Sequence, residues 1–201
     1  MKLFTSSFFN SKKKIMIVQS SPISTGSTVL VNILNGLICS KRPIYFDYGF
    51  FDFLEKKQIN LNNFKIFEKD FLLNDVNIVK THNLNLEVIS KTFSKKYDIY
   101  FVCSERDKSK IDAKYYSHKN VVIINYDDLL ETDENTVENI VDHVKRKLYP
   151  VLPKTVELNE QDAITRIKNM NSLYEFIKEK PFTFVDKFYH LHGSHRSKNL
   201  S

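Results

Sequence analysis

A lysine and a histidine, a cation and a possible proton acceptor, lie two positions apart in the sequence. Val76–Lys80 is a predicted strand, and Lys80 and His82 lie at its end, where residues two apart point to the same side. A histidine can accept a proton from a hydroxyl or amine, and a lysine can offset negative charge on a leaving oxygen. The pair is therefore a candidate for group transfer; the alternative is a surface lysine beside a loop histidine.

A turn made almost entirely of small hydroxyl residues is the second candidate. Its sequence is SSPISTGST, and it separates the β-branched run Ile15–Val18 from the apolar stretch 28–38, which predicts a buried strand followed by a buried helix. At a helix N-terminus, backbone N–H groups converge and the helix dipole favours negative charge. The turn predicts a phosphate or sulfate site; the alternative is an ordinary turn with Ser24, Thr25 or Ser27 as the helix cap.

The residue after the glycine separates two kinds of phosphate loop. A Walker loop needs a lysine there, because that lysine reaches the β- and γ-phosphates of a nucleoside triphosphate. In this chain Ser27 follows Gly26. ATP or GTP hydrolysis is therefore disfavoured, and a nucleotide or small-molecule kinase is a weaker alternative for the function.

These candidates need a scaffold that brings strand ends together. Predicted strands alternate with predicted helices along the first two thirds of the chain, which indicates a parallel sheet with helices on both sides. We expect an α/β, three-layer, P-loop-like fold with a central, mainly parallel sheet and reactive residues at the carboxyl ends of its strands. The expected strands are 15–18, 43–46, 76–80, 97–103 and 121–125, and the expected helices are 28–38, 84–93 and 107–116.

The last third of the chain is predicted to be helical and then basic. Thr132 or Asp133 can cap a helix whose apolar residues keep helical spacing from Val137 to Leu148, and a second helix is expected over 162–178. By length, residues 1–201 are expected to form a single domain. Residues 1–14 would be its N-terminal flank and 187–201 a basic C-terminal segment.

Composition limits the partners. The formal net charge of +6 suggests an anionic partner, and a nucleotide, a sulfated or phosphorylated substrate, RNA and a membrane surface all fit it. Nucleic acid is not the expected partner, because the sequence has no Arg-Gly repeats and no long basic block. Cys39 and Cys103 lie in apolar stretches, which predicts no disulfide and a reducing compartment. No segment has the ~18 apolar residues of a membrane span, so a cytoplasmic protein without a membrane span is expected.

Three motifs, in this order along the chain, resemble those of the sulfotransferases that use 3′-phosphoadenosine 5′-phosphosulfate. Pro22–Leu30 resembles their 5′-phosphosulfate loop, although Ser24 stands where many members have Lys or Arg. Lys80-Thr81-His82 resembles their Lys-Thr-His motif, and VVIINYDDLLET over 121–132 resembles a strand-to-helix passage of the family. The resemblance implies that His82 is the catalytic base, that Lys80 is its electrostatic helper and that no metal is required. It also implies a loop that binds the donor through Ser24, Thr25, Gly26, Ser27 and Thr28.

The resemblance also implies a site for the 3′-phosphate of the donor. Arg106, after the strand 97–103, is the candidate arginine, with Ser109 or Ser117 as its partner; alternatively Arg106 pairs with its neighbours Glu105 or Asp107 in solvent. A C-terminal loop that closes over this phosphate would contain Gly193 and Arg196. The histidines of this segment, His190, His192 and His195, could instead indicate a metal site. A phosphate-binding segment is favoured, because neither cysteine is nearby to complete a zinc site.

The expected function is therefore a sulfotransferase that moves a sulfuryl group to a hydroxyl or amine of a small-molecule or glycan acceptor. Adenosine 3′,5′-bisphosphate would be its second product. The first alternative is a catalytically silent, P-loop-like nucleotide-binding protein, which Ser24 favours. The acceptor and the oligomeric state cannot be deduced from the sequence.

Overall fold

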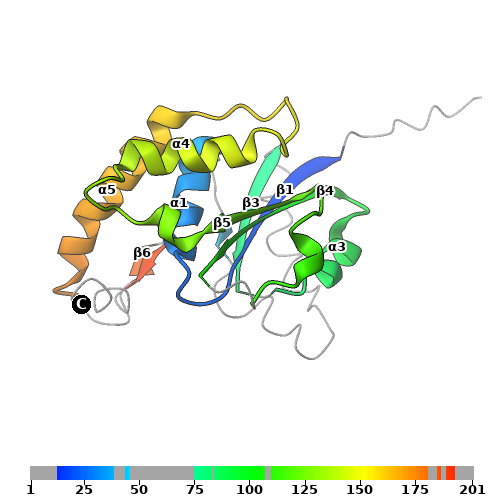
Figure 1. The fold of residues 1–201 in the computed structure, drawn as a ribbon, viewed down its shortest axis with the longest axis horizontal. Helices are drawn as coiled ribbons and strands as arrows, with labels where there is room; N and C mark the ends of the chain where they lie inside the picture. Colours follow the sequence, from blue (N-terminus) through cyan, green and yellow to red (C-terminus); the bar gives the residue numbers. More distant parts are fainter. Residues whose placement is uncertain are drawn as a thin grey trace, which may run out of the picture.

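Five parallel strands form the middle layer of the structure, a computed structural model that describes residues 13–38, 44–45, 75–82, 84–106, 110–180, 185–186 and 189–192 (Figure 1). The strand order is β2-β3-β1-β4-β5, and every neighbouring pair is parallel. This arrangement confirms the predicted α/β fold with a central parallel sheet between layers of helices. The strands are β1 Lys14–Ser20, β2 Ile44–Tyr45, β3 Val76–Thr81, β4 Tyr97–Glu105 and β5 Val121–Asn125.

Strand β1 lies in the middle of the sheet because its residues are apolar on both faces. Every residue of β1 after Lys14 is buried. Ile15 and Ile17 belong to the core on one face of the sheet, and Met16 and Val18 to the core on the other. The chain leaves β1 toward the β2 edge and leaves β4 toward the β5 edge, so the strand order reverses between them. In open α/β sheets such a reversal creates a crevice at the carboxyl ends of the strands.

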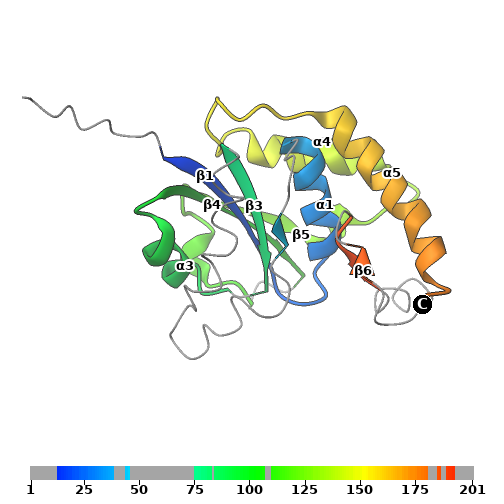
Figure 2. The same cartoon turned by 180° about the vertical axis from the view of Figure 1, so that it is seen from behind.

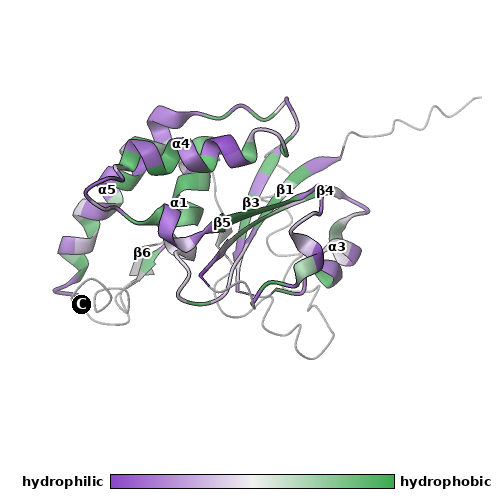
Figure 3. Cartoon of the chain, in the orientation of Figure 1, coloured by the Kyte–Doolittle hydropathy of each residue, from purple (hydrophilic) through white to green (hydrophobic). Residues whose placement is uncertain are grey.

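In the described part of the chain, α1 and α4 lie on one face of the sheet with α5 packed against both of them, and α3 lies on the other face (Figure 1). Helix α1 is buried over most of its length, whereas α4 has an apolar side and a polar side (Figure 3). The apolar residues of α4 that were predicted from their spacing are all buried. The helices on the first side are α1 Ser27–Ile38, α4 Val137–Leu148 and α5 Glu160–Ile177, and those on the second are α3 Leu86–Phe93 and the short 3-10 helix η2 Ala113–Tyr115.

Helices α1 and α5 lie side by side (Figure 2), and they approach each other closely at Gly36. A Cβ atom added at Gly36 would lie 2.3 Å from the Cα atom of Ala163, a distance that no side chain can occupy. The amide of Asn159, the N-cap of α5, also donates to the carbonyl of Leu37, with an N···O distance of 2.6 Å. These contacts fix α5 against α1.

The predictions for two helix boundaries were wrong. Residues 107–116 do not form a helix in the part that the structure describes, 110–116, which holds only η2. Helix α4 is capped by Thr136, whose Oγ1 accepts from the amide of Asn139 at 3.3 Å, and not by Thr132 or Asp133.

The C-terminal part forms a small hairpin beside α5. Strand β6 Val185–Asp186 pairs with β7 Leu191–His192 in an antiparallel manner. Leu191 joins the core that contains α1, and the ring of Tyr189 lies 5.0 Å from the guanidinium of Arg166 on α5. The helices in the described part of the chain are all too short or too polar to span a bilayer.

Candidate functional site

The hydroxyl-rich turn forms a loop between β1 and α1 with an unusual backbone. Ser24 has a φ of 65° and Gly26 a φ of 74°. Glycine adopts this left-handed conformation freely, whereas for serine it costs on the order of 1–3 kcal/mol and must be held by the surroundings. Helix α1 begins at Ser27 without an acidic residue in its first turn. The positive end of the helix dipole is therefore not neutralised within the helix, and an anion is favoured there.

Both strands that flank β1 hold the start of this loop through Ser21. On the β3 side, the amide of Ser21 donates to the carbonyl of Thr81 at 3.3 Å, and its carbonyl lies 2.9 Å from Nδ1 of His82. On the β4 side, its hydroxyl accepts from the amide of Ser104 at 2.8 Å. The loop is thus attached to the carboxyl ends of three neighbouring strands.

A buried cluster of hydroxyl groups lies beneath the loop. The Oγ atom of Ser104 lies 3.0 Å from the Oγ of Ser21 and 3.1 Å from the Oγ1 of Thr25, which also donates to the carbonyl of Pro22 at 2.7 Å. Ser21, Thr25 and Ser104 are all at most 4% exposed. Ser104 is not among the site residues predicted from the sequence; the signal that could have found it is a hydroxyl residue directly after the predicted strand 97–103.

Lys80 and His82 lie together at the carboxyl end of β3, beside the loop. Lys80 is only 2% exposed, so it is not the surface lysine of the alternative interpretation. Its Nζ lies 3.2 Å from Nε2 of His82. An ammonium group has only donors, so Nε2 is the acceptor of this hydrogen bond and the imidazole proton resides on Nδ1. That proton is then donated to the carbonyl of Ser21.

The loop glycine packs against η3 Tyr126–Leu129, the short 3-10 helix that follows β5. A Cβ atom added at Gly26 would lie 3.1 Å from Cδ1 of Leu129 and 3.2 Å from Cδ2 of Tyr126. Tyr126 also contacts Arg106, whose guanidinium carbon lies 4.3 Å from the centre of the Tyr126 ring. Gly26, Tyr126 and Arg106 are therefore connected, although they lie far apart in the sequence.

Among the predicted residues that lie outside residues 21–28, Ser117 is not brought to the loop by a contact that the structure shows. Ser117 is exposed, and its neighbour Tyr116 donates its hydroxyl proton to Glu105. Thr28 begins the helix beside Ser27 and accepts, through its carbonyl, from Nδ2 of Asn32 at 2.8 Å. Ser109, Gly193 and Arg196 lie outside the described residues, so their roles stay predictions.

Cys103 is close to the site in sequence but is not a nucleophile. Burial, together with the nearby charge of Glu105, raises the pKa of its thiol to about 12. The thiolate is the reactive form of cysteine, and it is scarcely populated at neutral pH. Since Cys103 is also fully buried, it is not a candidate nucleophile.

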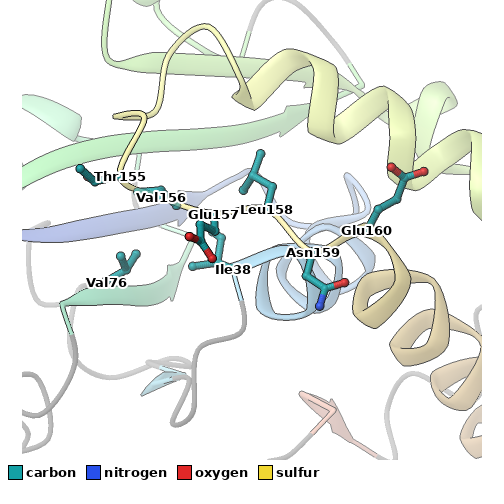
Figure 4. Close-up of a pocket in the computed structure, with 8 residues that line it drawn as sticks. All are labelled: Ile38, Val76, Thr155, Val156, Glu157, Leu158, Asn159 and Glu160. Carbon is teal, nitrogen blue, oxygen red and sulfur yellow. The ribbon is translucent and has the colours of Figure 1, made fainter.

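A cavity in the described part of the chain lies away from the loop (Figure 4). It has a volume of about 520 Å³ and lies between the C-terminal end of α1, at Ile38, and the segment 155–160 that leads into α5. Ile38, which lines this cavity, is eleven residues from Ser27, the first residue of α1. This separation corresponds to roughly 16 Å along the helix. A smaller cavity of about 270 Å³ is lined by Asp128, Asn135, Asn139, His143 and Arg146. Neither cavity includes Lys80, His82 or the loop.

Comparisons with known proteins add no assignment to this geometry. No protein-family model matches the chain, and no curated protein or solved structure matches it. Within the described residues, no group of three or more His, Cys, Asp or Glu side chains could hold a metal ion. The sulfotransferase resemblance therefore rests on the sequence motifs and stays a prediction.

Proposed function

We propose that the protein is a sulfotransferase that moves a sulfuryl group from 3′-phosphoadenosine 5′-phosphosulfate to a hydroxyl or amine acceptor. The observation that carries the proposal is the position of His82. Its Nε2 atom lies 3.2 Å from Nζ of Lys80, and its Nδ1 atom lies 2.9 Å from the carbonyl oxygen of Ser21. A proton acceptor, a cation and an anion-binding loop are thus adjacent, and this combination suits the transfer of an anionic group to a protic acceptor.

The residues of the loop fit the sulfate end of this donor. Backbone N–H groups at the start of α1 and the hydroxyls of Ser24 and Ser27 are donors that sulfate oxygens can accept from. The first turn of α1 has no carboxylate to repel an anion. The absence of a lysine after Gly26 favours a sulfate donor over a nucleoside triphosphate.

His82 and Lys80 would divide the chemistry between them. When bound, the donor supplies the sulfuryl group. His82 carries its lone pair on Nε2 and takes the acceptor's proton there, while Nδ1 continues to donate to Ser21 and keeps the ring oriented. Protonated Nε2 cannot accept from Lys80, so in this step the Lys80 ammonium would turn from His82 toward the negative charge that develops beside the loop. No metal is needed for these steps.

The finer parts of the proposal follow from the sequence. The acceptor is expected to be a small molecule or a glycan, and the protein is expected to act in the cytoplasm, because its few cysteines are typical of a reducing compartment. A catalytically silent, nucleotide-binding protein is the second candidate. The observation that favours it is Ser24, exposed and left-handed, at a position where the resemblance leads us to expect a cation.

Ligand-dependent melting tests the proposed function. Adenosine 3′,5′-bisphosphate should raise the melting temperature more than ATP with magnesium or GTP with magnesium does. A ligand at ~100 times its dissociation constant adds about 2.7 kcal/mol, which corresponds to roughly 5–10 °C for a domain of this size. Adenosine 5′-phosphate is the matched control, because it lacks the 3′-phosphate. Equal or greater stabilisation by ATP with magnesium would favour the kinase alternative.

A further inference from the structure

The ring of Tyr126 lies between the anion-binding loop and an arginine. The guanidinium carbon of Arg106 is 4.3 Å from the ring centre, well within the ~6 Å over which a cation is attracted to an aromatic face. Arg106 itself is exposed, whereas Tyr126 is partly buried. The better fixed of the two side chains is therefore the tyrosine.

The packing of η3 against Gly26 fixes Tyr126 relative to the loop. Its Cδ2 and Cε2 atoms lie 3.2 Å and 3.5 Å from the position of a Cβ atom added at Gly26, so the edge of the ring fills the space that the glycine leaves. Leu129, at the other end of η3, is 3% exposed and lies against the same glycine. The side chain of Asn125 caps η3 by accepting from the amide of Asp127 at 3.3 Å.

The loop needs a cation from elsewhere in the chain. Residues 21–28 carry no charged side chain, and Ser24 and Ser27 stand where other phosphate or sulfate loops have a basic residue. Lys80 supplies one positive charge on the β3 side of the loop. Arg106 follows β4, on the opposite side of β1 from β3, and the neighbouring carboxylate of Glu105 already accepts from Tyr116.

We propose that Tyr126 is a positioning residue that presents the Arg106 guanidinium to the anionic ligand of the loop. Arg106 makes the contact with the ligand, and Tyr126 acts through Arg106 by holding it over its ring. The packing of Tyr126 on Gly26 couples the position of this cation to the conformation of the loop. This inference rests on the proposed function only in requiring that the loop binds an anionic nucleotide.

A double-mutant cycle with adenosine 3′,5′-bisphosphate as the titrated ligand tests this inference. Arg106→Ala should weaken binding by about tenfold to a hundredfold, as expected for the loss of a charge-assisted contact. Tyr126→Leu, which removes the aromatic face and keeps an apolar side chain, should weaken it by about twofold to fivefold. The double variant should bind as Arg106→Ala alone does, because Tyr126 has no effect without the arginine.

Two controls separate positioning from general damage to the fold. Tyr126→Phe keeps the aromatic face, so it should bind within about twofold of the parent protein. Upfield ring-current shifts of the Arg106 side-chain protons, measured by NMR without ligand, should be present in the parent and Tyr126→Phe and absent in Tyr126→Leu. Melting temperatures of the ligand-free variants show that each is folded at the temperature of titration.

The possible outcomes are distinguishable. If the parent does not bind the bisphosphate, both the proposed function and the positioning role of Tyr126 are wrong. If the parent binds and Arg106→Ala weakens binding, but Tyr126→Leu binds as the parent does or its effect adds fully to that of Arg106→Ala, only the positioning role is wrong. Loss of binding in Tyr126→Phe equal to that in Tyr126→Leu would also overturn it, because the aromatic face would then be irrelevant.

Discussion

Replacing His82 with alanine should lower turnover by roughly a hundredfold or more and leave the affinity for adenosine 3′,5′-bisphosphate nearly unchanged. The imidazole is the group that takes the acceptor's proton, and loss of a general base typically has an effect of this size. The measurement is steady-state release of adenosine 3′,5′-bisphosphate from the sulfate donor, together with a binding titration. Turnover equal to that of the parent would remove His82 from the mechanism.

The alanine variant also removes the hydrogen bond from Nδ1 to the carbonyl of Ser21, so a second variant is needed. In His82→Asn the side-chain amide can still donate to Ser21 but cannot act as a base. We expect its turnover to be as low as that of His82→Ala. If His82→Asn recovers most of the parent's turnover, the contribution of His82 is to hold the loop and not to accept a proton.

Replacing Gly26 with valine should weaken both adenosine 3′,5′-bisphosphate and adenosine 5′-phosphosulfate by about a hundredfold or more. A β-branched side chain is strained at a φ of 74°, and its Cβ atom would press on Tyr126 and Leu129 at 3.2 Å and 3.1 Å. The loop must therefore change its conformation, and its N–H groups no longer converge on one point. Titration of both ligands, well below the melting temperature of the variant, is the measurement.

Gly26→Asn is the matched control, because asparagine tolerates left-handed backbone better than other side chains do. It should lose less affinity than Gly26→Val for both ligands. If valine at this position leaves both affinities as they are in the parent protein, the loop is not the ligand site.

The strand β1, the helix α1 and the Lys80–His82 pair could be predicted because the sequence patterns that indicate them are local. The run Ile15–Val18 and the apolar stretch 28–38 indicate a strand and a helix from periodicity alone, and the structure has β1 and α1 there. The spacing of Lys80 and His82 predicts that they share one face, and their side chains are in fact 3.2 Å apart. In each of these cases the relevant residues are close together in the sequence.

Contacts between distant segments could not be predicted in this way. Ser104 meets Ser21 across 83 positions, and Tyr126 meets Gly26 only because η3 returns to the loop after β5. Such pairs depend on strand order and register, and no local pattern encodes them.

The predictions for the helix at 107–116 and for the start of α4 were wrong because local side-chain hydrogen bonds compete with helix formation. The Asp112 side chain accepts from the amide of Lys114 at 3.1 Å and starts a short 3-10 turn there, where a longer helix had been expected. Thr132 closes a turn of its own with Asn135, through hydrogen bonds of 3.1 Å and 3.2 Å, so α4 begins only after Thr136. Asp and Thr favour such local turns.

An NMR titration of the isotope-labelled chain with adenosine 3′,5′-bisphosphate tests the central claim most directly, namely that the loop and the Lys80–His82 pair form one ligand site. The account predicts that the largest shifts fall on the backbone amides of residues 24–28 and on the His82 imidazole, with the same dissociation constant for both. Shifts confined to the cavity at residues 155–160, or no shifts at millimolar ligand, would contradict it.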